Sequence, residues 1–152
     1  SFAFIMWHVF HVHGWFHFDA WIKNVAEPLG GWQFRPFNAA TTLHSATSGI
    51  VIPIIYAIGA LACVFHLANG VWTMGITWGL WTSPAAQKRA SWVCLFGGQL
   101  VAALVVASLI GAIRVDVPRA KEAEDAMYQA RTAAKEIPLN EHKRSGGESE
   151  EH

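Results

Sequence analysis

Charge is scarce in most of this sequence. Only 14% of the 152 residues are charged, against about 25% in an ordinary soluble domain. Residues 36–87 and 90–113 contain no Asp, Glu, Lys or Arg. The charges that are present divide unevenly, because residues 1–114 carry five basic and two acidic side chains, a net of +3, and residues 115–152 carry six and nine, a net of −3. The chain is therefore expected to be an apolar body with a polar tail.

Cysteine is also scarce, and two usual signals of a chain start are missing. Cys63 and Cys94 form no CxxC or zinc-binding spacing, and on the helices expected here they lie about 20 Å apart in depth, so we interpret them as packing residues. No secretory signal is visible, because the apolar opening lacks a basic flank and a small-residue cleavage site. Since Ser1 opens directly into an apolar run without a cap, we expect a fragment that starts partway through a membrane helix.

The charge-free stretches predict transmembrane helices, since a hydrocarbon core about 30 Å thick needs roughly 20 helical residues. We expect spans at residues 1–18, about 43–80 and 91–114, with connecting loops at 19–41 and 82–90. Pro53 predicts a kink in the second span, and Ser91 is the expected N-cap of the third. The predicted fold is an all-α transmembrane bundle over residues 1–114, followed by a polar tail over residues 115–152.

The tail is predicted to be partly helical and partly disordered. Residues 119–136 are rich in good helix formers and charged on most sides, which favours a solvated helix, whereas the acidic end after Pro138 is typical of disorder. Orientation stays open from charge alone. Lys88 and Arg89 favour a cytoplasmic turn, yet the basic residues after the third span favour the tail on the same side.

Glycine and tryptophan mark the surfaces of the second span. Its glycines, with Gly75 and Gly79 in GxxxG spacing, predict close approach of another helix or of a flat cofactor. Tryptophans gather at both predicted membrane exits, as an interfacial aromatic belt would. The glycines are Gly59, Gly70, Gly75 and Gly79, and the tryptophans are Trp15, Trp21, Trp32, Trp78, Trp81 and Trp92.

Histidines stand out because ionisable residues at membrane depth usually face a bundle interior, a partner or a cofactor. The segment MWHVFHVHGWFHF, residues 6–18, contains four of them. His8 and His66 lie deepest, while His11, His13 and His17 approach the water. Neutral imidazole is a good iron ligand, and two helices can hold a haem between paired axial histidines. The alternative is that each imidazole merely bonds a neighbouring helix, and for the remaining histidines, His44 included, that interpretation is preferred.

A second hypothesis uses the histidine cluster alone as a metal site. His8 and His11, or His13 and His17, have the spacing to share a metal on one helix face. His8 and His17 point about 180° apart on a helix of 3.6 residues per turn, so the four cannot converge. Two alternatives to haem binding remain: a membrane histidine-cluster metal enzyme of the hydroxylase or desaturase type, and a structural anchor without a cofactor. No catalytic residue is predicted.

Two stretches resemble a known family. FHLANGVWTMGITWGLWTSPAAQKR, residues 65–89, resembles the fourth helix and following turn of the di-haem cytochrome b membrane subunit of succinate dehydrogenase and fumarate reductase. MWHVF, residues 6–10, is similar to that family's third helix. The order of the two stretches agrees as well, so residues 1 to about 114 correspond to helices three to five of a five-helix subunit.

The resemblance implies the function and the site. His66 would ligate the proximal of two b haems and His8 the distal one, and the partner ligands would come from helices one and two, which this sequence does not contain. The subunit would sit as a multi-pass protein in the cell inner (cytoplasmic) membrane, in contact with lipid. It would pass electrons between the iron–sulfur subunit and a menaquinone-type quinone in the respiratory chain, beside the flavoprotein subunit and with no nucleic-acid partner. The Lys88–Arg89 turn would be cytoplasmic.

Two further expectations concern depth and the quinone. If Phe18 and about Ser48 mark the same membrane face, His8 and His66 differ in depth by about 12 Å at roughly 1.5 Å per residue, an offset that suits two stacked redox centres. No quinone site can be assigned. The polar candidates at membrane depth are Gln99, Asn69 and Ser108, each more typical of a helix-packing hydrogen bond.

Overall fold

The computed structural model describes residues 1–139 and 143–144, and this part of the chain is helical without any strand. The all-α prediction is confirmed. The elements are α1 (Phe2–His13), α2 (Asp19–Trp21), a π-helical turn η1 (Ile22–Ala26), a 3₁₀ turn η2 (Pro36–Asn38), α3 (Ala39–Ala46), α4 (Val51–Thr77), α5 (Pro84–Ile113) and α6 (Val117–Ala133).

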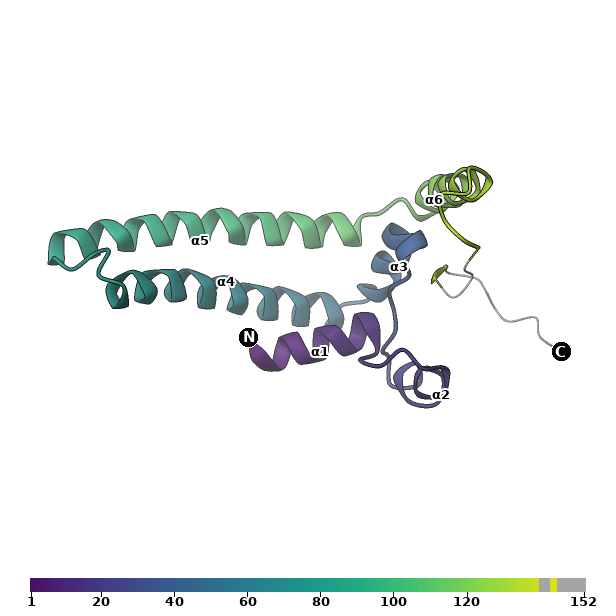
Figure 1. Cartoon of the computed structure of the whole chain (residues 1–152), viewed down its shortest axis with the longest axis horizontal. Helices are drawn as coiled ribbons and strands as arrows, with labels where there is room; N and C mark the ends of the chain where they lie inside the picture. Colours follow the sequence, from purple (N-terminus) through teal and green to yellow (C-terminus); the bar gives the residue numbers. More distant parts are fainter. Residues whose placement is uncertain (140–142, 145–152) are drawn as a thin grey trace.

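Two long helices, α4 and α5, form an antiparallel hairpin that dominates the molecule (Figure 1). With 27 and 30 residues they are about 40 and 45 Å long, more than a hydrocarbon core needs. Only 17% of the most apolar window of α4, and none of that of α5, is buried within the chain. Because a core helix of a soluble protein would be mostly buried, this exposure favours lipid as the solvent. In the part described, these are the two helices long and apolar enough to cross a membrane.

The first predicted span is shorter than expected. Helix α1 has 12 residues and ends at His13 rather than at residue 18. Gly14 takes a left-handed φ of +70° and donates its N–H to the Phe10 carbonyl, a conformation that favours glycine and closes helices. Residues 32–34 then return along this end and bond the carbonyls of residues 10–12. The terminal carbonyls of α1 are therefore satisfied by the loop.

The second predicted span is two helices, and the kink prediction at Pro53 is wrong. The chain breaks at residues 47–50 instead, where Gly49 has a φ of +79°. Pro53 is the third residue of α4, within the first turn, where a backbone N–H has no intrahelical partner to lose. The proline is compatible with this helix start and causes no bend in its interior.

The third predicted span, α5, begins at Pro84, seven residues before the expected start at residue 91. Ser83, not Ser91, caps α5 by accepting the Ala86 N–H at 3.2 Å, and Pro84 occupies the first turn. Ser91 has another role: its hydroxyl donates to the Gln87 carbonyl and accepts from Trp72 of α4 at 3.1 Å. The loop expected at 82–90 therefore lies earlier in the chain, at residues 78–83.

The four glycines of the second predicted span have different surroundings. At Gly59 a Cβ would overlap the ring of Phe4, so this glycine lets α1 approach α4, as helix packing predicted. Gly75 instead accommodates the ring of Trp81, and Gly79 is a turn residue with a φ of +74°. The GxxxG pair therefore shapes the α4–α5 turn and does not form a helix–helix contact. Gly70 has no atom within 4 Å of its ideal Cβ position, so the cofactor interpretation stays a prediction there.

Gly59→Val should separate α1 from α4. Overpacking of a close contact costs about 1–3 kcal/mol, so the free energy of unfolding in detergent should fall by about that amount relative to Gly70→Val. Both variants place the same side chain inside α4, but only Gly59 faces a ring. Equal stability of the two variants would contradict the proposed contact.

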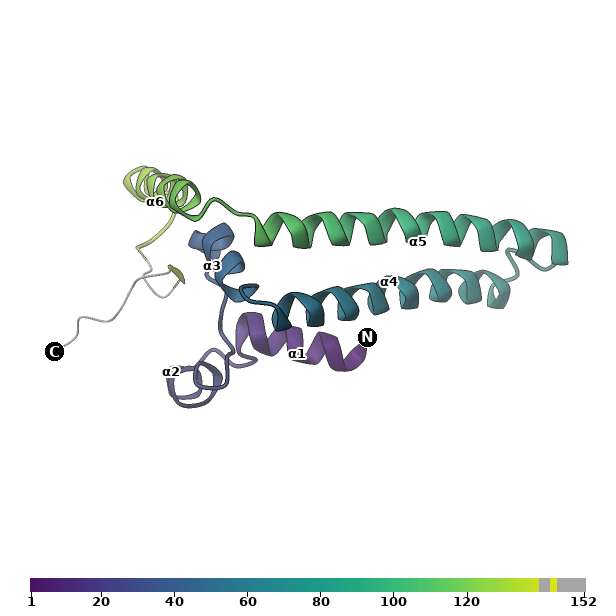
Figure 2. The same ribbon diagram turned by 180° about the vertical axis from the view of Figure 1, so that it is seen from behind.

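The polar tail begins with α6, which lies at the end of the hairpin beside α3 (Figure 2). The predicted helix over 119–136 is present as Val117–Ala133, with Asp116 as N-cap. One face is not solvated, because Glu124 and Tyr128 are buried against α3 and η2. Most of the end predicted to be disordered, residues 140–142 and 145–152, lies outside the described residues. Cys63 and Cys94 are both free.

Candidate functional site

His8 lies on the face of α1 that packs against α4. Three pairs define an antiparallel register: Ser1 with Ala62, Phe4 with Gly59, and His8 with Tyr56. The Nδ1 atom of His8 is 3.1 Å from the Tyr56 hydroxyl. His8 is thus half-buried between two helices, held by one ring nitrogen.

His11 shares the same hydroxyl. Its Nδ1 is 3.0 Å from Tyr56 Oη, and its side chain is buried. The two histidines are three residues apart on one helix face, which brings both rings to a single phenol. The sequence left His11 unassigned and did not single out Tyr56. The available signal was a polar aromatic residue inside the apolar stretch IVIPIIYAIGALA, residues 50–62.

Aromatic rings enclose this hydroxyl. Trp7 stacks on His11 with ring centroids 4.9 Å apart and an interplanar angle of 14°, and it meets Tyr56 edge-on at 5.3 Å. Phe4 stacks on His8 at 5.9 Å and also meets Tyr56 edge-on, at 5.7 Å. Such pairs fix ring orientation beyond simple area burial. The His8–Tyr56–His11 group is therefore held from both sides by α1.

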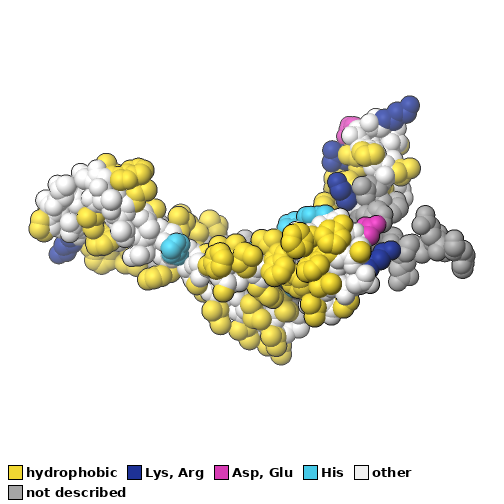
Figure 3. Space-filling model, turned by 60° about the horizontal axis from the view of Figure 1, so that its bottom comes forward, with side chains coloured by type: hydrophobic (Ala, Val, Ile, Leu, Met, Phe, Trp, Pro, Cys, Tyr) yellow, Lys and Arg dark blue, Asp and Glu magenta, His cyan; other side chains and the backbone are white. Residues whose placement is uncertain are grey.

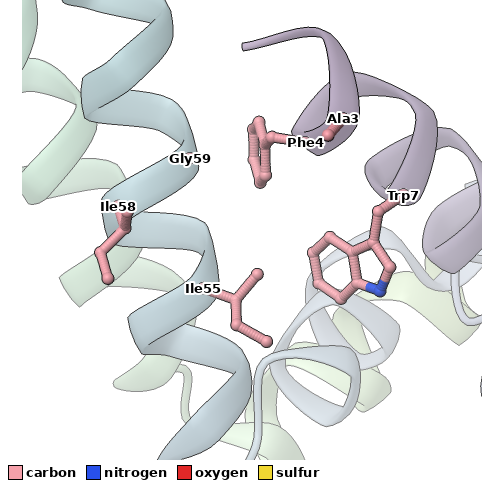
Figure 4. A pocket seen from close by; sticks show the side chains of 6 residues that line it. All are labelled: Ala3, Phe4, Trp7, Ile55, Ile58 and Gly59. Carbon is pink, nitrogen blue, oxygen red and sulfur yellow. The ribbon is translucent and has the colours of Figure 1, made fainter.

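A small apolar groove adjoins this group. Phe4 and Trp7 of α1 point toward α4, and Ile55, Ile58 and Gly59 form the opposite wall (Figure 4). Its volume is about 410 Å³. Its walls offer dispersion contacts and almost no polar groups, so the polar chemistry of this region belongs to the His8–Tyr56–His11 group.

His66 is on α4, ten residues after Tyr56 and closer to the α4–α5 turn. At roughly 1.5 Å per residue it lies about 15 Å from the level of His8 along the helix, and about 80° around it from Tyr56. The side chain is exposed and makes no hydrogen bond within the described residues. The offset agrees with the 12 Å expected from the sequence. His66 therefore stands apart from His8, in a different layer.

The donor set of these two residues fits a haem iron. A ligand histidine needs one nitrogen with a free lone pair, and usually gives its other N–H to a second group. His8 has Nδ1 engaged and no partner at Nε2 within the described part of the chain. His66 has both nitrogens accessible. Each could supply one nitrogen ligand to iron, and neither belongs to a group of three or more metal-binding side chains among the described residues.

The histidine-cluster hypothesis is not favoured. No group of three or more His, Cys, Asp or Glu side chains with metal-binding geometry occurs within residues 1–139 and 143–144. His13 and His17 have ring centroids 6.4 Å apart, and His17 packs edge-on against Trp32 instead. His44 bonds the Ala112 carbonyl at 3.1 Å, linking α3 to the end of α5. Figure 3 shows histidine side chains at two separate places on one face.

The polar candidates for a quinone site do not converge. Ser108 donates its hydroxyl to the Leu104 carbonyl at 2.8 Å within α5. Asn69 and Gln99 are exposed on α4 and α5, and their side chains make no hydrogen bond within the part of the chain described. Ser108 thus bonds within its own helix and not to a neighbouring one, and the roles expected for Asn69 and Gln99 stay predictions.

A buried carboxylate organises the end of the molecule where the tail begins. Glu124 of α6 accepts the Ala40 N–H at 2.6 Å and the Thr41 hydroxyl at 2.8 Å, and lies 3.4 Å from the Asn38 amide. An acidic group at the first turn of a helix is favourable, and here it satisfies the backbone N–H of Ala40 in α3. The tail is therefore docked onto η2 and the start of α3.

Ion pairs lie in the polar parts of the chain. Arg144 donates to Asp125 at 2.7 Å, and this hydrogen bond lowers the pKa of the Asp125 carboxyl. In the loop, burial lowers the pKa of the Arg35 guanidinium, while the Glu27 carboxylate 3.4 Å away acts in the opposite direction. Both pairs lie outside the apolar hairpin, as the charge distribution of the sequence predicted.

Comparison with known proteins identifies one relative at the level of sequence. The chain is 27% identical over 92 residues to the succinate dehydrogenase cytochrome b558 subunit of Bacillus subtilis (strain 168), which covers 60% of this chain and 38% of that subunit. The chain thus spans well under half the length of this curated relative. No protein-family model matches the chain, and no solved structure matches it. The resemblance indicated by residues 6–10 and 65–89 is confirmed: this chain is similar to a cytochrome b membrane subunit of succinate dehydrogenase.

Proposed function

We propose that this chain is part of a membrane-anchor cytochrome b subunit of a succinate:quinone oxidoreductase, with His8 and His66 as axial ligands of two b-type haems. The observation that carries the proposal is the pair of imidazoles on neighbouring antiparallel helices, about 15 Å apart along the helix direction, each with no hydrogen-bond partner at Nε2 among the described residues. They lie in the part of the molecule without Asp, Glu, Lys or Arg. The curated relative, a succinate dehydrogenase cytochrome b558 subunit, supports the same assignment.

The residues of the chain have distinct tasks in this proposal. His66, nearer the α4–α5 turn, serves the proximal haem on the side of the iron–sulfur subunit, and His8 serves the distal haem. The apolar faces of α1, α4 and α5 exclude water and fix the separation of the two sites. Bound haem would supply one-electron redox chemistry between the iron–sulfur subunit and a menaquinone-type quinone. Because succinate and fumarate react in the partner subunits, we assign no catalytic residue to this chain.

The proposed orientation places the Lys88–Arg89 turn at the cytoplasmic face of a multi-pass protein. Lys and Arg are enriched in cytoplasmic loops, and this turn is where the iron–sulfur and flavoprotein subunits would contact the anchor. The loop after α1, α3 and α6 then lie on the opposite side. Figure 3 shows charged side chains only toward the ends of this face, with hydrophobic side chains between them.

Spectroscopy of the complete membrane complex tests this function. A dithionite-reduced minus oxidised difference spectrum should show b-type α and Soret bands, and pyridine haemochrome analysis should give two haems per complex. A complex with no visible spectrum would instead support the cofactor-free anchor. Bound non-haem iron or zinc without a Soret band would support the histidine-cluster enzyme, and either result would contradict the proposal.

A further inference from the structure

The hydroxyl of Tyr56 stands between two imidazoles, and a phenol has one proton to donate. It can therefore donate to only one of the two Nδ1 atoms that lie 3.1 and 3.0 Å away. With both imidazoles neutral, the other must donate its own Nδ1–H to the phenol oxygen. Two arrangements satisfy all three groups, and they differ in which histidine is the donor.

The two arrangements differ in their consequence for iron. When His8 Nδ1–H donates to Tyr56, the lone pair of His8 is on Nε2, where it can bind a metal. When Tyr56 donates to His8, the proton of His8 is on Nε2 and blocks ligation. In the first arrangement Tyr56 donates onward to Nδ1 of His11, whose proton is then on Nε2.

We propose that Tyr56 is the positioning residue of the distal haem ligand: it accepts the Nδ1–H of His8, fixes the tautomer with a free Nε2, and is itself oriented by donating to His11. This inference rests on the proposed function of His8. It gives His11 a role as the acceptor that completes the chain of hydrogen bonds, and it distinguishes His11 from His13 and His17, which make no contact with Tyr56.

The packing supports an orienting role. His11 is buried and stacks on Trp7, so its ring cannot turn away from the phenol without breaking that stack. Tyr56 meets Phe4 and Trp7 edge-on, which fixes the direction of its C–O bond. A hydrogen bond from the ligand imidazole increases its basicity, and a more basic ligand stabilises oxidised iron. Tyr56 is therefore expected to hold the distal haem at a lower reduction potential.

Tyr56→Phe in the complete membrane complex tests the inference. The variant keeps the ring and its packing but removes the hydroxyl oxygen that His8 and His11 share. Haem content should be unchanged, and redox titration should show that the midpoint reduction potential of one haem is higher than in the wild type. The expected shift corresponds to a tenfold change in the reduction equilibrium, about 59 mV for a one-electron couple. The potential of the other haem should not change. Thr73→Val is the matched control on α4, because Thr73 donates only to the Asn69 carbonyl of its own helix.

Two histidine variants separate the outcomes. His8→Ala should lose the haem whose potential Tyr56→Phe shifts, and His11→Phe should keep it. Tyr56→Phe and Thr73→Val could give the same two haem potentials while His8→Ala still loses a haem. In that case the proposed role of Tyr56 is wrong and the proposed function stands. If His11→Phe loses the haem and His8→Ala keeps it, the arrangement of tautomers is reversed and the inference is overturned. If His8→Ala and His66→Ala both keep full haem, the proposed function itself fails.

Discussion

His66→Ala in the complete membrane complex should lose one of the two b-type haems, and His8→Ala should lose the other. Each variant removes one axial nitrogen, and the two histidines lie about 15 Å apart along the helix pair, so neither can replace the other. About half of the haem absorbance should remain in each variant. A potentiometric titration of the difference spectrum should then show a single component, with a different midpoint in the two variants.

His17→Ala is the control for this experiment. His17 lies beyond the end of α1 and packs edge-on against Trp32 at 5.0 Å, outside the α1–α4 contact. Its removal takes one imidazole from the same histidine-rich segment and should leave both components of the titration in place. If His17→Ala lost a haem while His8→Ala did not, the distal ligand would be assigned to the wrong histidine.

Glu124→Ala should release α6 from the rest of the molecule. The carboxylate is buried and receives the Ala40 N–H and the Thr41 hydroxyl, with the Asn38 amide close by. Alanine would leave buried donors without a partner, at a cost of about 3 kcal/mol. The docking equilibrium should therefore weaken roughly 100-fold. Cleavage within α6 by trypsin follows the population of the undocked form, so its rate should rise by a similar factor.

Glu122→Ala is the matched control for the release of α6. Glu122 is exposed on the same helix and makes no hydrogen bond or ion pair within the described residues. The variant removes the same charge and the same atoms from α6, so trypsin should cleave it at nearly the wild-type rate. Equal cleavage rates in the two variants would show that the buried carboxylate does not hold the helix.

Sequence patterns were sufficient for the elements that depend on composition over many residues. The charge-free stretches predicted the two helices of the hairpin, because only a long run of apolar side chains makes exposure to lipid favourable. The order of the hydrophobic and charged parts predicted an apolar body and a polar tail. The resemblance of residues 65–89 pointed to the family of the curated relative without any knowledge of tertiary contacts, because the motif is continuous in the sequence.

Helix ends were harder to predict because they depend on single backbone conformations. Gly14 ends α1 five residues before the predicted end, since its left-handed φ closes the helix and the returning loop bonds the free carbonyls. Pro53 looked like an interior kink but stands in the first turn of α4. Ser83 and Ser91 were both plausible N-caps, and only the geometry shows which one accepts a backbone N–H.

The sequence by itself determined the resemblance to a cytochrome b membrane subunit and the apolar hairpin, because length, hydropathy and motif spacing are local properties of the chain. The tertiary structure decided which side chains meet. Tyr56 is 45 residues from His11, and Glu124 is 84 residues from Ala40. Such pairs leave no periodic signal in one sequence, because a hydrogen bond between distant residues depends on how two helices are rotated and shifted against each other. That arrangement places one hydroxyl between two histidines and one carboxylate at the start of α3.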